Sequence, residues 1–258
     1  MRLVSLNAWG GKAFGPLVKF LKEASPKTDV FCFQEVLRTT SRVKTRAGFR
    51  VNLYSELERR LPNFRGHMAV SEKRCIPTGP VNFHCDLGLA IFVRKSYTVR
   101  SHKSFPIGVS RKVVPWKRGG WKEIAQYVTV GLGNKPYVFC NVHGIADWPK
   151  TDTPERLEQS RKIIKVLRQF KGRKIVCGDF NLGPETESVR MFEEAGMRNL
   201  VKGYGVRETR SILFYEQNPG AEDKISDYVF ISPDVNVKKF IVPAVAVSDH
   251  LPFILDFS

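Results

Sequence analysis

An aspartate and a histidine stand side by side close to the end of the chain, as Asp249-His250. A carboxylate can hold a metal ion, and an imidazole can gain or lose a proton near neutral pH. The pair alone is a weak signal, but three other short apolar runs also end in polar residues. These runs contain Leu6-Asn7-Ala8-Trp9-Gly10, Gln34-Glu35-Val36 and Gly178-Asp179-Phe180-Asn181. Strand ends are places where a rigid scaffold can bring such side chains together.

Two more polar residues adjoin β-type runs in the same way. His143 follows the apolar run 137–142, and Asp227 opens the run 227–231. An aspartate such as Asp227 can hold a nearby imidazole in one tautomer and favour its charged form. Asp179 and Asn181 stand two positions apart, so strand alternation would point both side chains to the same side.

Glu35 comes directly after the predicted strand 30–34, which would place its carboxylate at the rim of the core. Mg²⁺ prefers oxygen ligands and often takes one or two carboxylates together with phosphate and water. Singly, each of these polar residues has an ordinary structural explanation. A lone histidine in such a place is usually a satisfied polar group, and a glutamate at a strand end usually faces solvent. Their shared position beside predicted strands is harder to explain in this way.

Short β-type runs alternate with helical stretches along the chain, without a repeat or a long linker. The runs predict strands at residues 2–6, 30–34, 87–93, 125–130, 137–142, 174–178, 227–231 and 253–257. Apolar spacing predicts helices near 16–24, 53–61, 153–170 and 187–195, and Gly196 ends the last of them. Strands near both ends and in the middle favour a single α/β domain over residues 1–258, with mixed strand pairing.

The second strong feature of the sequence is its positive charge. The chain has 42 Lys and Arg against 25 Asp and Glu, a formal net charge of +17. Residues 38–50 and 94–122 concentrate this charge, and neither stretch contains an acid. Concentrated positive charge attracts a phosphate-rich partner such as nucleic acid. Solvated basic loops without such a partner are the alternative explanation.

The cysteines are scattered, and Cys32, Cys140 and Cys177 lie inside apolar runs. We therefore expect buried free thiols in a reducing compartment and no disulfide framework. The first residues hold too short an apolar stretch for a signal peptide, and no apolar run is long enough to span a bilayer. These features predict a cytoplasmic protein without a membrane span, and we expect a monomer.

Taken in order, the polar motifs resemble those of the endonuclease/exonuclease/phosphatase superfamily. They run from Asn7 to His250 and so span nearly the whole chain. The motifs are Leu-Asn-x-Trp-Gly, Gln-Glu-Val, Asn-x-His, Gly-Asp-Phe-Asn, Ser-Asp-Tyr and Ser-Asp-His-x-Pro. The superfamily includes pancreatic-type deoxyribonucleases, abasic-site endonucleases, deadenylases, neutral sphingomyelinases and inositol polyphosphate 5-phosphatases. As an ordered set, the motifs are highly specific.

The resemblance implies an α/β fold, a four-layer α/β/β/α sandwich of two packed mixed β-sheets flanked by helices. The active site would lie at one edge of the two sheets. The resemblance also implies phosphoester hydrolysis with a divalent metal, usually Mg²⁺, for which Mn²⁺ could substitute. Carried over by position, the metal-site residues are Asn7, Glu35 and Asp249. The catalytic residues are His143, Asp179, Asn181, Asp227 and His250.

The resemblance also assigns roles to these residues. Asp179 would orient or deprotonate the attacking water, and Asn181 would hold the water or the phosphate. His250, oriented by Asp227, would act at the phosphate as an acid or base or by stabilising charge. His143 occupies the position near the leaving group. The sequence leaves open the number of metal ions and whether Asp179 or His250 is the base.

The family motifs fix the reaction type and leave the substrate to the loops between them. In residues 101–121, Lys and Arg mix with Phe105, Trp116 and Trp121, which suits nucleic acid because bases stack on aromatic rings. The two tryptophans could instead pack this loop onto the sandwich. The predicted substrate-binding residues are Arg111, Lys112, Trp116, Lys117, Arg118, Arg207 and Arg210.

We therefore expect a divalent-metal-dependent nuclease that hydrolyses phosphodiester bonds of DNA or RNA. The alternative is a sphingomyelinase-like or inositol-phosphate phosphatase-like phosphoesterase, since the Asn-x-Trp-Gly opening also occurs in sphingomyelinase-like branches. A third hypothesis is an inactive module that binds nucleic acid through its basic loops.

Overall fold

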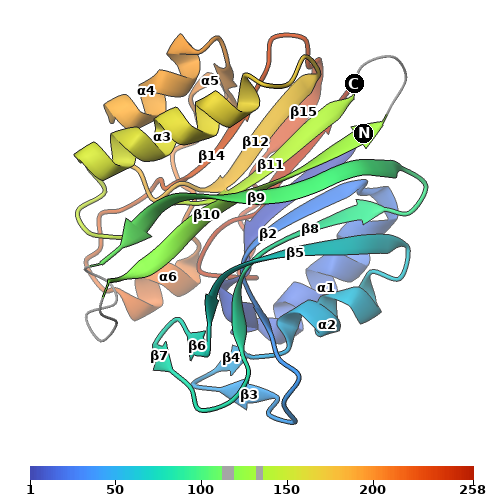
Figure 1. The fold of residues 1–258 in the computed structure, drawn as a ribbon, viewed down its shortest axis with the longest axis vertical. Helices are drawn as coiled ribbons and strands as arrows, with labels where there is room; N and C mark the ends of the chain where they lie inside the picture. Colours follow the sequence, from blue (N-terminus) through green and yellow to red (C-terminus); the bar gives the residue numbers. More distant parts are fainter. Residues whose placement is uncertain (112–118, 132–135) are drawn as a thin grey trace.

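Two six-stranded β-sheets lie at the centre of the computed structural model, which describes residues 1–111, 119–131 and 136–258 (Figure 1). In order across it, the first sheet contains β15 (Val237–Ile241), β16 (Phe253–Phe257), β1 (Arg2–Asn7), β2 (Val30–Arg38), β8 (Asp86–Arg94) and β5 (Phe64–Lys73). The second contains β13 (Arg198–Asn199), β14 (Asp227–Ile231), β12 (Arg173–Asp179), β11 (Tyr137–His143), β10 (Trp121–Gly131) and β9 (Thr98–Ser110). The pairs β1–β2 and β11–β12 are parallel and their neighbours antiparallel, so both sheets are mixed.

Helices cover the outer faces of the two sheets (Figure 1). The first sheet carries α1 (Phe14–Ala24) and α2 (Leu53–Arg60), and the second carries α3 (Pro154–Leu167) and α4 (Glu187–Glu194). Leu17 of α1 joins one apolar cluster with Phe31 of β2, and Ile163 of α3 joins another with Phe230 of β14. The expected four-layer α/β/β/α sandwich is thus confirmed.

Shorter elements connect these layers. The described residues also form the hairpins β3 (Thr45–Arg46) with β4 (Phe49–Arg50) and β6 (Cys75–Ile76) with β7 (Gly79–Pro80), the helices α5 (Leu200–Gly203) and α6 (Ile212–Gln217), and the 3₁₀ turns Trp9–Gly11 and Ser25–Lys27. None of the helices in the described part of the chain has both the length and the apolar character needed to cross a bilayer.

The sequence did not predict the strands β5, β9 and β15. All of them lie at or near sheet edges, where one side of the ladder is open and polar side chains are tolerated. Strand β9 even contains Pro106, which interrupts the usual strand signal. The predicted free thiols are confirmed, because Cys32, Cys140 and Cys177 are buried and unbridged between the sheets.

A β-bulge in β2 decides where Glu35 points. The register with β8 shifts between Phe33 and Val36, so that Gln34 and Glu35 together oppose one residue. Glu35 has φ +53°, in the left-handed region that side chains rarely adopt. The expectation that Glu35 follows the end of a strand is therefore wrong. It lies inside β2, and the bulge rather than the strand end turns its side chain.

A buried amide pair fastens this bulge to the opposite sheet. Gln34 Nε2 donates to Oδ1 of Asn141, on β11, at 2.5 Å. Asn141 Nδ2 donates to the backbone carbonyls of Phe33 at 2.9 Å and Ala90 at 3.3 Å. Both carbonyls lie where the bulge interrupts the β2–β8 ladder, so the Asn141 side chain supplies hydrogen bonds that the ladder does not.

Gly88, on β8, lies between this bulge and a second register shift in β5. A Cβ atom at this position would lie 1.9 Å from the carbonyl oxygen of Ala69, which is backbone and cannot swing away. Glycine therefore allows β5 and β8 to approach each other here.

We expect Gly88→Ala to lower the free energy of unfolding by about 1–3 kcal/mol, because the added methyl group overpacks the strand pair. The matched control is Gly15→Ala in α1, where an added Cβ meets nothing within 4 Å. That change should raise stability by up to about 1 kcal/mol through helix propensity. Urea unfolding of both variants measures the two changes in the free energy of unfolding. An unchanged free energy of unfolding in Gly88→Ala would contradict the packing argument.

Two histidines, His67 and His102, pack their rings 5.1 Å apart where β5 approaches β9. Gln126 Nε2 donates to the carbonyl of His67 at 2.6 Å and lies 2.9 Å from His102 Nε2, so this ring nitrogen accepts. Burial, together with the charges of His102 and Arg65, lowers the pKa of His67, and burial lowers the pKa of His102. The folded protein therefore favours the neutral form of both rings.

We expect the pair to make the protein less stable as the pH falls below about 6.5, where the unfolded chain binds more protons than the folded one. His67→Phe should flatten this loss, since His67 Nε2 has no hydrogen-bond partner among the described residues. Urea unfolding between pH 7.5 and 5.5 measures the difference between the two proteins. Parallel pH profiles for the wild type and the variant would rule out this role.

Candidate active site

Polar side chains from both sheets meet in one cavity of about 250 Å³. All eight predicted catalytic and metal-site residues converge there. Asn7 and Asp227 bond to residues that line the cavity. The other six line it directly: Glu35, His143, Asp179, Asn181, Asp249 and His250.

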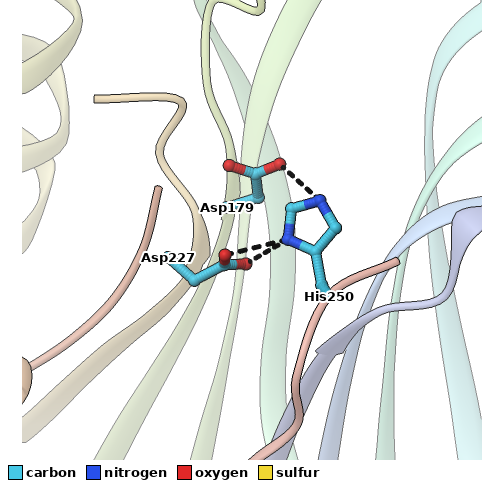
Figure 2. Close-up of side chains that lie close together, drawn as sticks. All are labelled: Asp179, Asp227 and His250. Atoms are coloured by element: carbon cyan, nitrogen blue, oxygen red, sulfur yellow. Dashed lines mark hydrogen bonds and ion pairs between the residues drawn. The ribbon is translucent and has the colours of Figure 1, made fainter. Parts of the chain in front are cut away.

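The imidazole of His250 lies between two aspartates (Figure 2). Its Nδ1 lies 2.9 and 2.8 Å from the two carboxylate oxygens of Asp227, and its Nε2 lies 3.5 Å from Asp179 Oδ2. The hydroxyls of Thr209 and Ser226 donate to Asp227 Oδ2 at 2.8 and 3.0 Å. Asp227 is thus held as an acceptor, and Nδ1 of His250 carries a proton toward it.

The Asp179 carboxylate is buried, with 2% of its surface exposed. Burial alone would raise its pKa, but positively charged neighbours hold the pKa of this carboxyl far below its usual range: His250, Lys150, Arg210 and His143. In return, the pKa of His250 is raised, because the nearby aspartates outweigh the opposing effects of burial and of Arg210. Asp179 therefore keeps its negative charge, and His250 is a stronger base than a free imidazole.

Asn181 reaches the cavity through a turn rather than through strand alternation. It has φ +54°, its backbone N–H donates to Asp179 Oδ1 at 2.9 Å, and its Nδ2 donates to the Gly144 carbonyl at 3.2 Å. Alternation does not apply because β12 ends at Asp179, although both side chains still line the cavity. Gly178 allows β12 to approach β11 closely, since a Cβ there would lie 2.1 Å from the Val142 carbonyl oxygen.

Asn7 connects Glu35 to Asp179. Its Nδ2 donates to Glu35 Oε1 at 3.1 Å and to Asp179 Oδ2 at 3.3 Å, while its Oδ1 accepts the Trp9 amide at 3.0 Å. Because the Trp9 N–H requires the oxygen, the amide nitrogen of Asn7 faces both carboxylates. The Asn7 amide therefore links the two carboxylates.

His143 has a carboxylate on each side. Its Nδ1 lies 3.0 Å from Glu123 Oε2, and its Nε2 lies 3.6 Å from Glu35 Oε1. Burial lowers the pKa of His143, but these two carboxylates raise it well above its ordinary value. Glu123 also accepts a 2.5 Å hydrogen bond from Ser110 Oγ, so a second imidazole in the site has a fixed carboxylate behind it.

The carboxylates of Glu35 and Asp249 are suited to a divalent cation. Burial and the charge of Glu35 raise the pKa of Asp249, so the two carboxylates repel each other in the protein alone. A hard cation with oxygen ligands would relieve this repulsion. The cluster of Asp179, Asp227 and His250 is less suitable, although its ligand atoms lie within 4.8 Å of one another. Asp227 and Arg210 already occupy the two ring nitrogens of His250.

The structure separates the predicted basic residues. Arg210 lines the cavity, and its Nη1 contacts His250 Nε2. Arg207 instead lines a different hollow with Tyr228, and Arg111 lines a neighbouring pocket with Trp148. The predicted residues Lys112, Trp116, Lys117 and Arg118 lie outside the described residues.

The sequence did not indicate Glu123, Lys150 or Asp223, which surround the site. Glu123 offered a signal, because it is an acid within the apolar run of β10. Lys150 and Asp223 come from loops, and no local pattern marks either of them.

Comparisons with known proteins bear on the family and the fold. The model of the Endonuclease/Exonuclease/phosphatase family matches residues 4–250. A protein of this family from Bacteroides vulgatus has a TM-score of 0.70 at 18% identity, over 100% of this chain and 98% of that one. The mannosyl-6-phosphatase of Bacteroides thetaiotaomicron has a TM-score of 0.69 at 18% identity, over 100% and 99%. The human Nocturnin catalytic domain has a TM-score of 0.65 at 18% identity, over 100% and 93%. Curated protein sequences give no significant match.

We expect Mg²⁺ to raise the melting temperature, because a ligand that binds only the folded state stabilises it, by about 2.7 kcal/mol at 100 times its Kd. Glu35→Gln keeps the shape of the side chain but removes its charge, and should lose most of this shift. Thermal unfolding with Mg²⁺ and with a chelator measures the effect, and the exposed Glu23→Gln is the control. An equal shift in Glu35→Gln would remove Glu35 from the metal site.

Proposed function

This chain belongs to the endonuclease/exonuclease/phosphatase family, and we propose that it is a divalent-metal-dependent phosphodiesterase that cleaves nucleic acid. The observation that carries the hydrolytic part is the position of His250. Its imidazole lies between Asp227 and Asp179 and faces a cavity that also holds Glu35 and Asp249. This arrangement joins a proton carrier, a water-orienting carboxylate and cation ligands in one small space.

We assign the handling of the attacking water to Asp179, Asn181 and His250. Asp179 and Asn181 line the cavity together and would orient the water. The depressed pKa of Asp179 makes it a weak proton acceptor, so His250, supported by Asp227, would take the proton. A divalent cation held by Glu35 and Asp249 would supply charge neutralisation at the phosphate.

His143 would act on the other side of the phosphate. Glu123 orients its ring, and its Nε2 lies toward Glu35. A donor at this position could protonate the oxygen that leaves. His250, paired with Asp227, would thus accept the proton of the attacking water, and His143, paired with Glu123, would protonate the leaving oxygen.

The distribution of positive charge supports a nucleic-acid substrate. The net charge is +17, and the β3–β4 hairpin extends from one end of the sheets (Figure 1). Arg46 of this hairpin and Lys44 just before it are exposed cations. The hairpin shares an apolar cluster with Trp121, which lines the cavity. A polyanion longer than the cavity could therefore meet these cations while one phosphate reaches His250.

A small phosphoester is the competing substrate class. The mannosyl-6-phosphatase of similar fold illustrates that this scaffold also carries phosphatases. Sphingomyelin and inositol phosphates are further small phosphoesters of this class. The net charge and the basic hairpin favour the longer polyanion over these alternatives.

We expect Mg²⁺-dependent cleavage of DNA or RNA in a panel that also contains abasic DNA, sphingomyelin, inositol phosphates and a sugar phosphate. Asp179→Asn and His250→Asn should each lower turnover by about 10²–10⁴-fold, the usual contribution of an acid or base group. The exposed Asp234→Asn should leave turnover unchanged. Hydrolysis of the small substrates alone would overturn the nuclease proposal, and full activity of either catalytic variant would overturn the role assignment.

A further inference from the structure

A chain of buried charges lies directly behind the catalytic imidazole. Lys150, from the loop before α3, places its Nζ 2.7 Å from Asp223 Oδ2, and Arg210 places its Nη2 3.1 Å from the same oxygen. The side chains are 6%, 7% and 6% exposed for Lys150, Asp223 and Arg210. Two cations therefore share one carboxylate in a region with little water.

Of these three charged residues, Arg210 is the one that reaches the catalytic cavity. Arg210 lines the cavity, and its Nη1 contacts His250 Nε2. Its Nε is buried and has no hydrogen-bond partner among the described residues. Burial of an incompletely satisfied guanidinium is costly, so a site that keeps one is suited to an anion that completes its hydrogen bonds.

The backbone holds Arg210 in this place. A short antiparallel bridge joins Arg210 to His250, with hydrogen bonds from Ser211 N to Asp249 O at 2.9 Å and from Leu251 N to Thr209 O at 2.8 Å. The guanidinium and the catalytic imidazole therefore come from two backbone segments that are hydrogen-bonded to each other. A group that reaches one of them necessarily approaches the other.

We propose that Lys150, Asp223 and Arg210 form an oxyanion-binding arm of the cavity, which recognises the unbridged oxygens of a phosphoryl group. Arg210 donates to these oxygens, because its planar fork of N–H groups matches phosphate geometry. Binding of the phosphoryl group transfers the Arg210 Nη1 hydrogen bond from His250 to the anion and leaves His250 Nε2 open to the water or the phosphate. The assignment rests on the proposed phosphoester hydrolysis.

Lys150 and Asp223 act as positioning residues in this arm. Asp223 fixes the direction of the guanidinium, and Lys150 takes up part of the Asp223 charge. Without Lys150, the whole carboxylate charge would fall on Arg210 and weaken its hold on an anion. Burial lowers the pKa of Lys150, and the charge of Arg210 lowers it further because the two cations lie close together.

Inorganic phosphate is the probe, and its binding in Mg²⁺ buffer is measured by calorimetry without any turnover. We expect Arg210→Gln to weaken phosphate binding by about 10- to 100-fold, as for the loss of charge-assisted hydrogen bonds. Lys150→Met should weaken it by a smaller factor, and Lys150→Arg should restore it. The matched control is Lys202→Met, which breaks an exposed Lys–Glu pair of 2.8 Å and should change nothing.

Two further measurements separate recognition from a purely structural role. Millimolar guanidinium should restore phosphate binding to Arg210→Ala, and Arg210→Lys should retain the fold but bind phosphate weakly. Phosphate binding that is unaffected by Arg210→Gln, or equally weakened by Lys202→Met, would overturn the proposal. If the wild type binds phosphate through Arg210 but hydrolyses no phosphoester, the arm stands and the proposed function fails.

Discussion

The buried contact between Gln34 and Asn141 is the interaction on which the rest of the site depends. It joins the middle strands of the two sheets, and both side chains are fully buried. Asn141 also supplies hydrogen bonds to the carbonyls of Phe33 and Ala90, beside the bulge that turns Glu35 into the cavity. A buried carbonyl left without a partner costs about 1–3 kcal/mol, so the bulge is stable only while the opposite sheet supports it. The position of the Glu35 carboxylate is thus a property of both sheets together.

This connection divides the site between the two sheets. The first sheet and its bulge provide Asn7 and Glu35, and the second provides His143, Asp179 and Asp227. The Asn7 amide, which bonds Glu35 and Asp179, closes the gap between the two sets. Electrostatic interactions then stabilise the charged side chains that the two sheets bring together. The negative charge of Asp179 is balanced by several cations, and each imidazole has a carboxylate on its far side.

Much of this arrangement could be predicted from the sequence, since polar residues beside apolar runs mark where strands deliver their side chains. Asp179, His143 and Asp227 are in the positions expected from these runs. Glu35 lies within a strand because a bulge leaves no mark in hydrophobic periodicity. Lys150 and Asp223 could not be predicted, because a loop residue is defined by what folds against it. The edge strands β5 and β9 were missed for a related reason, since partial exposure weakens their apolar alternation. Arg207 shows the limit of inference from charge alone, because it faces a hollow away from the cavity.

The central claim is that water, handled by Asp179 and His250, attacks phosphorus in this cavity. Cleavage of a single-stranded oligonucleotide in ¹⁸O-labelled water with Mg²⁺, followed by mass spectrometry of the products, tests this claim directly. The claim requires one labelled oxygen in the terminal phosphate for each bond cleaved, and no cleavage when the divalent cations are chelated. Label in the sugar hydroxyl, or cleavage that persists with the chelator, would contradict it.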